Sequence, residues 1–127
     1  MSRPKRVLLV DEDSLFRQIL APVLERSTSL KESVQACSLT ATRQLLSDPD
    51  KKPDLVIVDL DLTNGGRFDL LIGELRVVVP DVPVIGITLK DDAQRREWAL
   101  RAGAYEVLTM AAPPEEIVKA ANRLIGE

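Results

Sequence analysis

The sequence contains no histidine and only one cysteine, Cys37, among its 127 residues. The lack of histidine excludes imidazole metal ligands, Ser-His and Cys-His nucleophiles, and any phosphohistidine carried by this chain. A single cysteine excludes an internal disulfide. Because Cys37 falls in a stretch where apolar and polar residues alternate, we expect a buried core thiol. Any chemistry must therefore depend on carboxylates, hydroxyls, lysines and a bound metal.

The chain also lacks a strong excess of one charge and any long apolar run. Its 17 basic and 20 acidic residues give a net charge of −3, so no broad basic surface for nucleic acid or anionic membrane is expected. Without a signal peptide, the chain is expected to be cytoplasmic. Its length and its hydrophobic content of 45% suit one domain over residues 1–127, and we expect Met1 to be a genuine start.

Strand-like and helix-like segments alternate along the whole chain. This alternation is typical of a parallel sheet whose strands are connected by helices. We predict an α/β fold of the flavodoxin-like (βα)5 type, a doubly wound five-stranded parallel sheet in the order 2-1-3-4-5. The predicted strands lie near 5–10, 33–37, 55–59, 82–87 and 104–109, and the predicted helices begin near 13, 40, 68, 91 and 113.

Acidic side chains directly follow two of the predicted strands. Asp11 and Glu12 come after the first strand, Asp59 and Asp61 mark the end of the third, and Thr88 ends the fourth. If strands one and three are neighbours, these groups meet where the winding of the sheet reverses, which is where ligands bind in such folds. Crowded carboxylates repel one another unless a cation is present, and oxygen ligands without histidine or cysteine suit Mg²⁺. The pattern therefore predicts a magnesium site.

Four segments, in their order and spacing, resemble the receiver domain of bacterial two-component response regulators, a CheY-like superfamily. The resemblance extends over essentially the whole chain. The segments are VLLVDED at 7–13, PDLVIVDLD at 53–61, VPVIGIT at 82–88 and AGAY at 102–105.

The resemblance implies a role for each of the residues at the strand ends. Asp59 would accept a phosphoryl group from a partner histidine kinase or phosphotransfer protein. Asp11, Glu12, Asp59 and the main-chain carbonyl of Asp61 would hold Mg²⁺, and Thr88 would bind the phosphoryl oxygens. No residue is expected to make this chain an enzyme in its own right. A homodimer through the face formed by the fourth helix, fifth strand and fifth helix is a further candidate assembly.

The sequence departs from the receiver pattern at the end of the fifth strand. Met110 stands where receivers of this kind have a lysine that pairs with the phosphoryl group. A thioether offers no hydrogen-bond donor, so the phosphorylated state would lack a charge-assisted bond. Val107 replaces the usual aromatic partner of Thr88, so the usual switch is expected to be altered. Lys90 could partly substitute for the missing cation, although a solvated loop lysine is the simpler expectation.

Two other functions fit part of the same pattern. The segment DLDLT at 59–63 is similar to the first motif of haloacid-dehalogenase-type phosphatases, in which the first aspartate is the nucleophile and the second the general acid. That family has its nucleophile on the first strand, and here too few residues follow Asp59 and no role remains for Asp11. The other alternative is a pseudo-receiver, a binding module whose partner recognition does not depend on phosphate. The absence of a lysine at Met110 favours it, and the otherwise complete acid set opposes it.

Overall fold

The computed structural model describes residues 4–11, 14–61, 68–89, 92–109 and 114–126, without the side chains of 14–16. Glu12, Lys90 and Met110, which were predicted to belong to the site, lie outside the described residues. Within the described chain, five parallel strands form one sheet in the order β2-β1-β3-β4-β5. The strands are β1 (Lys5–Val10), β2 (Leu30–Ala36), β3 (Leu55–Asp59), β4 (Val84–Thr88) and β5 (Glu106–Thr109).

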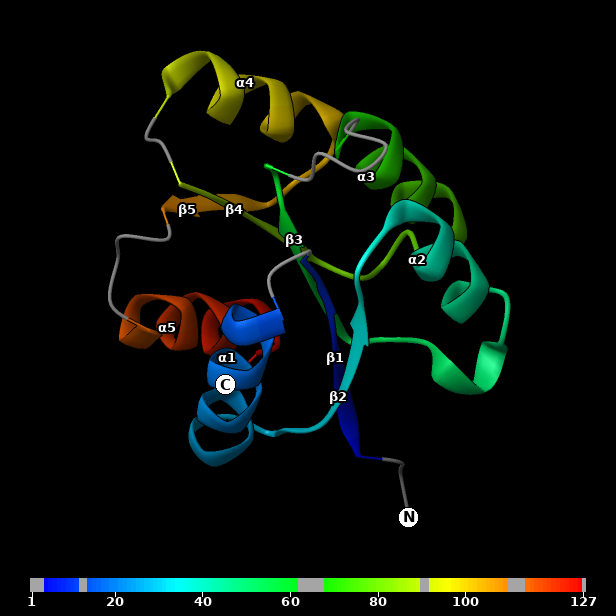
Figure 1. Cartoon of the computed structure of the whole chain (residues 1–127), viewed down its shortest axis with the longest axis vertical. Coiled ribbons are helices and arrows are strands. Elements are labelled where there is room, and N and C mark those ends of the chain that lie inside the picture. Colours follow the sequence, from blue (N-terminus) through cyan, green and yellow to red (C-terminus); the bar gives the residue numbers. More distant parts are fainter. Residues whose placement is uncertain (1–3, 12–13, 62–67, 90–91, 110–113, 127) are drawn as a thin grey trace.

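Helices cover both faces of this sheet. The α-helices are α1 (Ser14–Ser27), α2 (Leu39–Leu46), α3 (Phe68–Val78), α4 (Ala93–Ala102) and α5 (Pro114–Leu124), and a short 3₁₀ helix η1 spans Pro49–Lys51. Figure 1 shows α1 and α5 together on one face and α2, α3 and α4 on the other. The predicted doubly wound fold with strand order 2-1-3-4-5 is therefore confirmed.

The central strands form because their residues suit a position buried on both faces. Every residue of β3 and of β4 is buried, and both strands consist mainly of valine and isoleucine. Branched side chains of this kind pack well on a pleated surface that helices cover from both sides. The buried residues divide into two clusters, one on each face of the sheet. The sheet thus separates two apolar layers and carries the polar residues to its edge.

Helix ends follow the local signals in the sequence. Asp92 caps α4 by accepting a hydrogen bond from the Gln94 N–H at 2.9 Å, and Ser38 caps α2 through the Ala41 N–H at 3.1 Å. Gly103 ends α4 with φ of 128°, a conformation that side chains rarely adopt. The sequence pattern allows Asp91 or Asp92 to cap a helix that ends at Gly103, and the structure confirms this with Asp92 as the cap.

The structure corrects several details. Cys37 is exposed, so the expected buried thiol is wrong. Its neighbour Ala36 is the last residue of β2 and is buried, and the alternation of an extended chain directs the next side chain to the other side. Strand β2 starts at Leu30, earlier than predicted, whereas β4 and β5 start two residues later than predicted.

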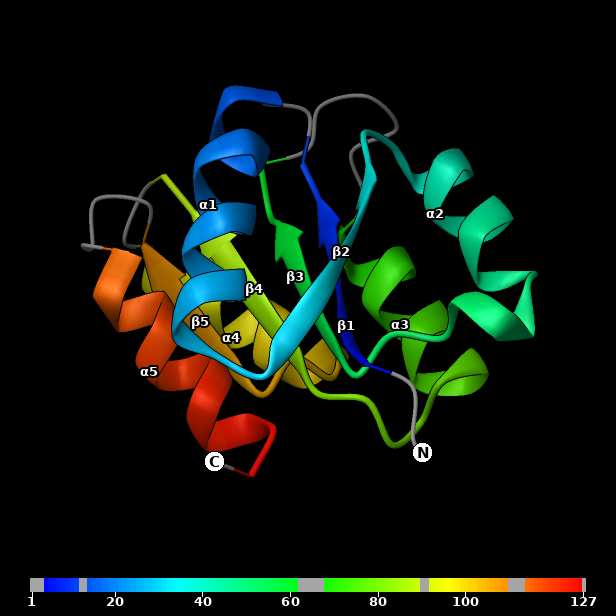
Figure 2. The same ribbon diagram turned by 90° about the horizontal axis from the view of Figure 1, so that it is seen from below.

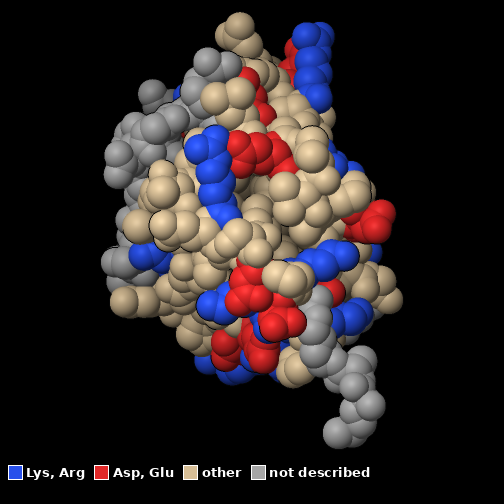
Figure 3. Space-filling view, turned by 90° about the vertical axis from the view of Figure 1, so that its right-hand side faces the viewer, with Lys and Arg blue, Asp and Glu red and all other residues tan. Residues whose placement is uncertain are grey.

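Charged side chains are mixed on the face that carries α2 and α3. Figure 3 views this side, where basic and acidic groups lie next to one another among large uncharged areas. One ion pair here joins the two helices, because the Arg43 Nη2 atom lies 2.5 Å from Glu74 Oε1. This face presents no continuous basic patch of the kind that binds nucleic acid. Among the described helices, none combines the length and the apolar character needed to cross a lipid bilayer.

Candidate functional site

The predicted site residues lie together where β1, β3 and β4 end, at the carboxyl end of the sheet. Val10 of β1 pairs with Val58 of β3, so the next residues of the two chain segments, Asp11 and Asp59, lie side by side. Asp59 also pairs with Ile87 of β4. Figure 2 shows the carboxyl ends of β1 and β3 at the same edge. Asp11, Asp59 and Thr88 are all buried, with 3%, 8% and 1% of their surface exposed.

Asp11 lies close enough to Asp59 to affect the ionisation of its carboxyl group. Burial raises the pKa of Asp59 to about 7, against the opposing effect of the Asp61 N–H, and the charges of Asp11 and Asp61 add to the increase. That N–H donates to Asp59 Oδ1 at 2.8 Å and so fixes the orientation of the carboxylate. The guanidinium of Arg17 in α1 donates a hydrogen bond to the main-chain carbonyl of Asp11. The site therefore holds two acids that resist joint ionisation.

This pair of acids suits a hard cation. A divalent ion next to Asp11 and Asp59 would favour the ionised form of both, and carboxylate oxygens are the ligands that Mg²⁺ prefers. The described residues alone contain no cluster of three potential metal ligands, and Glu12 lies outside them. A void of about 10 Å³ adjoins the two aspartates, enough for one water or ion. Small-molecule pockets are far larger, typically about 300 Å³ or more.

The side chain of Asp61 points away from this pair and toward β4 and α4. Its carboxylate accepts the Thr88 hydroxyl, with Oγ1 at 3.1 Å from Oδ1, and the Leu89 N–H at 2.7 Å from Oδ2. The Arg95 guanidinium of α4 forms an ion pair with the same carboxylate, with Nη1 at 3.1 Å from Oδ1. Arg95 Nη1 also donates to the Leu60 carbonyl at 2.9 Å. Three elements thus meet at one carboxylate.

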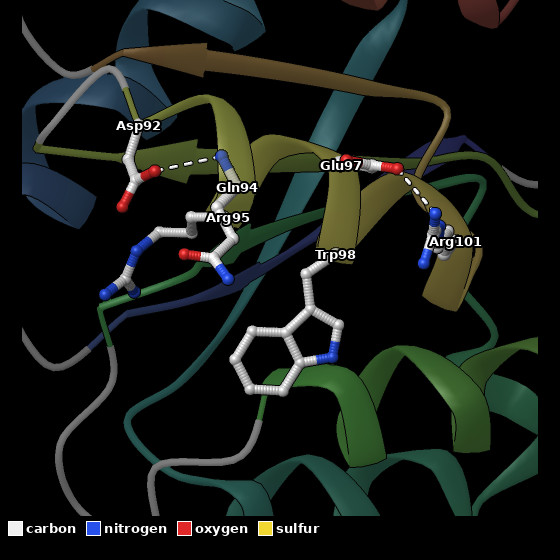
Figure 4. A pocket seen from close by; sticks show the side chains of 6 residues that line it. All are labelled: Asp92, Gln94, Arg95, Glu97, Trp98 and Arg101. Carbon is white, nitrogen blue, oxygen red and sulfur yellow. Dashed lines mark hydrogen bonds and ion pairs between the residues drawn. The ribbon is translucent and has the colours of Figure 1, made fainter.

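Arg95 also belongs to the site, although the sequence pattern does not indicate it. It lies on α4, seven positions after Thr88, and no local motif indicates that its side chain returns to the end of β3. The same helix lines a surface hollow of about 510 Å³ together with its cap, and Figure 4 shows the six side chains. In this view Arg95 and Trp98 leave α4 in different directions. Trp98 is 45% exposed and its ring lies 4.8 Å from that of Phe68.

Comparison with known proteins agrees with this geometry. The model of the response regulator receiver domain matches residues 7–122. The phosphate regulon transcriptional regulatory protein PhoB of Pseudomonas aeruginosa is 27% identical over 90% of this chain and 48% of its own length. The methanol utilization control regulatory protein MoxX of Paracoccus denitrificans is also 27% identical, over 94% of this chain and 52% of its own. This chain therefore spans about half the length of the curated relatives that it matches.

Solved structures show the same fold. A two-component response regulator from Clostridium difficile superimposes with a TM-score of 0.85 at 20% identity, covering 95% of each chain. The receiver domain of NtrX from Brucella abortus superimposes with a TM-score of 0.82 at 24% identity, covering 94% of this chain and 97% of its own. The match over residues 7–122 agrees with the buried acids at the strand ends. This chain belongs to the response regulator receiver domain family.

Proposed function

We propose that this receiver domain accepts a phosphoryl group on Asp59 from a sensor histidine kinase or a phosphotransfer protein. The observation that supports this most directly is the position of the Asp59 carboxylate. It lies beside Asp11 at the carboxyl edge of the sheet and is held by the Asp61 N–H at 2.8 Å. An oriented carboxylate can act as a nucleophile toward phosphorus. One of its oxygens forms the new bond to phosphorus as the bond from phosphorus to the donor's nitrogen breaks.

The residues around Asp59 have distinct tasks in this transfer. The Asp61 N–H keeps the carboxylate in one orientation, and the Thr88 hydroxyl donates to a phosphoryl oxygen once it has left the Asp61 carboxylate. Asp11, Glu12, Asp59 and the main-chain carbonyl of Asp61 would hold Mg²⁺, which supplies positive charge next to the phosphoryl oxygens when bound. The chain's contribution is thus orientation and charge, with no substrate turnover of its own.

The switch that follows phosphorylation is proposed to be altered in this chain. Met110 offers no donor for the phosphoryl group at the position where the family resemblance implies a lysine. Val107, which is buried in β5, has no aromatic ring whose movement could be coupled to that of Thr88. A homodimer through α4, β5 and α5 is the proposed assembly, since Leu100 and Tyr105 expose 43% and 48% of their surface there.

Intact mass measurement tests the proposed function. After incubation with Mg²⁺ and acetyl phosphate, the wild-type chain should gain one phosphoryl group, and hydroxylamine should remove it because an acyl phosphate is labile to that nucleophile. Asp59→Ala should gain none, whereas Asp81→Ala, a change at an exposed acid, should behave as wild type. Failure of the folded wild type to gain mass would favour the phosphate-independent binding module.

The phosphatase alternative predicts a different result. A phosphatase would hydrolyse a generic phosphoester such as p-nitrophenyl phosphate over many turnovers and would lose that activity in Asp61→Asn. The Asp61 carboxylate, which would be the general acid in that mechanism, is already held by the Thr88 hydroxyl and by Arg95. We therefore expect no turnover from the wild type, and turnover that depends on Asp61 would contradict the proposal.

A further inference from the structure

Asp61 contacts both the proposed phosphoacceptor and the proposed phosphoryl-binding hydroxyl. Its main-chain N–H contacts Asp59 Oδ1 at 2.8 Å, and its carboxylate accepts the Thr88 hydroxyl at 3.1 Å. A phosphoryl group on Asp59 would therefore be formed close to a second negative charge. Phosphoryl groups carry close to two negative charges at neutral pH, so an uncompensated Asp61 would oppose their binding.

Arg95 supplies the opposite charge at this point. Its Nη1 atom lies 3.1 Å from Asp61 Oδ1 and 2.9 Å from the Leu60 carbonyl oxygen. The guanidinium also lies over the Phe68 ring, with Cζ 6.0 Å from the ring centroid. Contacts with three separate groups restrict the side chain more than a single surface ion pair would. The cation is thus fixed next to Asp61 before any phosphoryl group arrives.

We infer that Arg95 is a positioning residue of the phosphorylation site, acting through Asp61. By neutralising the Asp61 carboxylate and holding it against the Leu89 N–H, Arg95 permits a dianionic group to bind at Asp59. This role rests on the proposed phosphorylation of Asp59. It assigns compensation of charge to α4, whereas the sequence pattern directed attention to Lys90 and to the missing lysine at position 110.

A direct bond from Arg95 to the phosphoryl group is the competing explanation. In that case the benefit of Arg95 would not depend on the charge of Asp61. The two explanations separate in a double-mutant cycle of Arg95→Gln and Asp61→Asn, because such a cycle measures whether two residues act through one another. Asp61→Asn keeps the shape of the side chain, and Arg95→Gln keeps a shorter side chain that can still form hydrogen bonds, so each change mainly removes a charge.

The probe is beryllofluoride, a mimic of a phosphoryl group on a carboxylate, titrated with Mg²⁺ and followed by calorimetry. Arg95→Gln should weaken binding by about fivefold, the upper range for a partly exposed ion pair. In the Asp61→Asn background the same change should have an effect within about twofold. Arg95→Lys, which keeps the charge, should restore most of the affinity. In the unliganded protein, Arg95→Gln should move the Leu89 amide resonance and Arg95→Lys should return it toward its original position.

Arg101→Gln is the matched control, because it removes an exposed ion pair with Glu97 on the same helix. It should bind the probe as wild type does. An equal loss from Arg95→Gln in both backgrounds, or no loss in either, would overturn the inference while leaving phosphorylation of Asp59 intact. Absence of binding by the folded wild type would overturn the proposed function and, with it, this inference. Circular dichroism of each variant shows whether a loss of binding reflects a loss of folding.

Discussion

Because Asp59 is buried, both the neutral and the ionised form of its carboxyl group are populated near neutral pH. The pKa of about 7 reflects burial first and the nearby acids second. The proposed role of Asp59 as a nucleophile needs an ionised carboxylate, so the proposal requires that the site offset this tendency. A cation bound by the same acids would do so, which links metal binding and reactivity at one residue.

The raised pKa of Asp59 predicts that metal-free protein loses stability as the pH rises from about 4 to about 7. In that window the folded state binds a proton at Asp59 that the unfolded state has already lost, so raising the pH favours unfolding. The free energy of unfolding should fall by an amount on the order of 4 kcal/mol. Urea denaturation in EDTA at several pH values measures this change.

Two comparisons isolate the contribution of Asp59 to that fall. Asp59→Asn, which cannot ionise, should show a flatter pH profile and a higher stability than wild type at pH 7.5. Millimolar Mg²⁺ should raise the melting temperature of the wild type at that pH and have little effect on Asp59→Asn. An unchanged profile in Asp59→Asn would contradict the predicted burial cost.

Met110→Lys tests the other charge at the site. A lysine there should strengthen the phosphorylated state through a charge-assisted bond worth about 1.5–3 kcal/mol. The receiver pattern implies that the same lysine would also meet the acids before phosphorylation, so the net gain should be smaller than the bond itself. Amide spectra around Thr88 and Val107, with and without phosphodonor, measure the response. Equal responses in wild type and variant would show that position 110 does not limit the switch.

Local patterns predicted the acids of the site but not its partners. Asp11, Asp59 and Thr88 were identifiable because each ends a buried strand, a relation that depends only on neighbouring residues. The ion pair between Arg95 and Asp61 depends on how α4 packs beside the end of β3. No periodicity within a helix encodes that contact, because a partly exposed arginine is typical of almost any helix surface.

At the level of elements, Gly103 connects the end of α4 to β5 in a way that other residues do not allow. Its φ is 128°, and a Cβ atom there would meet Arg76 Cγ at 2.7 Å. The Arg76 side chain is held in place, because its guanidinium donates hydrogen bonds to the Pro80 and Val82 carbonyls. Gly103→Ala should therefore destabilise the protein by about 1–3 kcal/mol through backbone strain and displacement of Arg76.

Gly73 provides the opposite case within α3. A Cβ atom there meets nothing within 4 Å, so Gly73→Ala should stabilise the protein by about 0.5–1 kcal/mol through the better helix propensity of alanine. Urea denaturation of both variants compares the two positions. Similar effects of the same sign would contradict the assignment of strain to Gly103.

The elements themselves were predictable where the sequence carries a strong repeat or a cap. The buried runs of β1 and β3, the Asp92 cap and the Gly103 stop all follow from local chemistry. Strand β2 was placed late because Lys31 and Glu32 interrupt its apolar pattern at the edge of the sheet, where one side of the strand has no neighbour. Edge strands tolerate charge that central strands do not, so composition locates them poorly.

The whole molecule consists of two apolar layers separated by a single sheet. Ile72 of α3 belongs to the buried cluster on one face and Ile117 of α5 to the cluster on the other. Both clusters include side chains from β1 and β3, so each layer uses strands that the other also needs. A domain built in this way should unfold as one cooperative unit.

Paired substitutions test this unity. Ile72→Val and Ile117→Val each remove one buried methylene and should each lower the free energy of unfolding by about 0.5–1.5 kcal/mol. Because the two residues pack in different clusters, the double variant should lose the sum within about 0.5 kcal/mol, with an unchanged dependence on urea concentration. Fluorescence of Trp98 and far-ultraviolet circular dichroism should report one shared transition. If the two signals separated, the layers would unfold independently. Because β1 and β3 contribute side chains to both layers, loss of either layer alone would then be enough to separate Asp11 from Asp59.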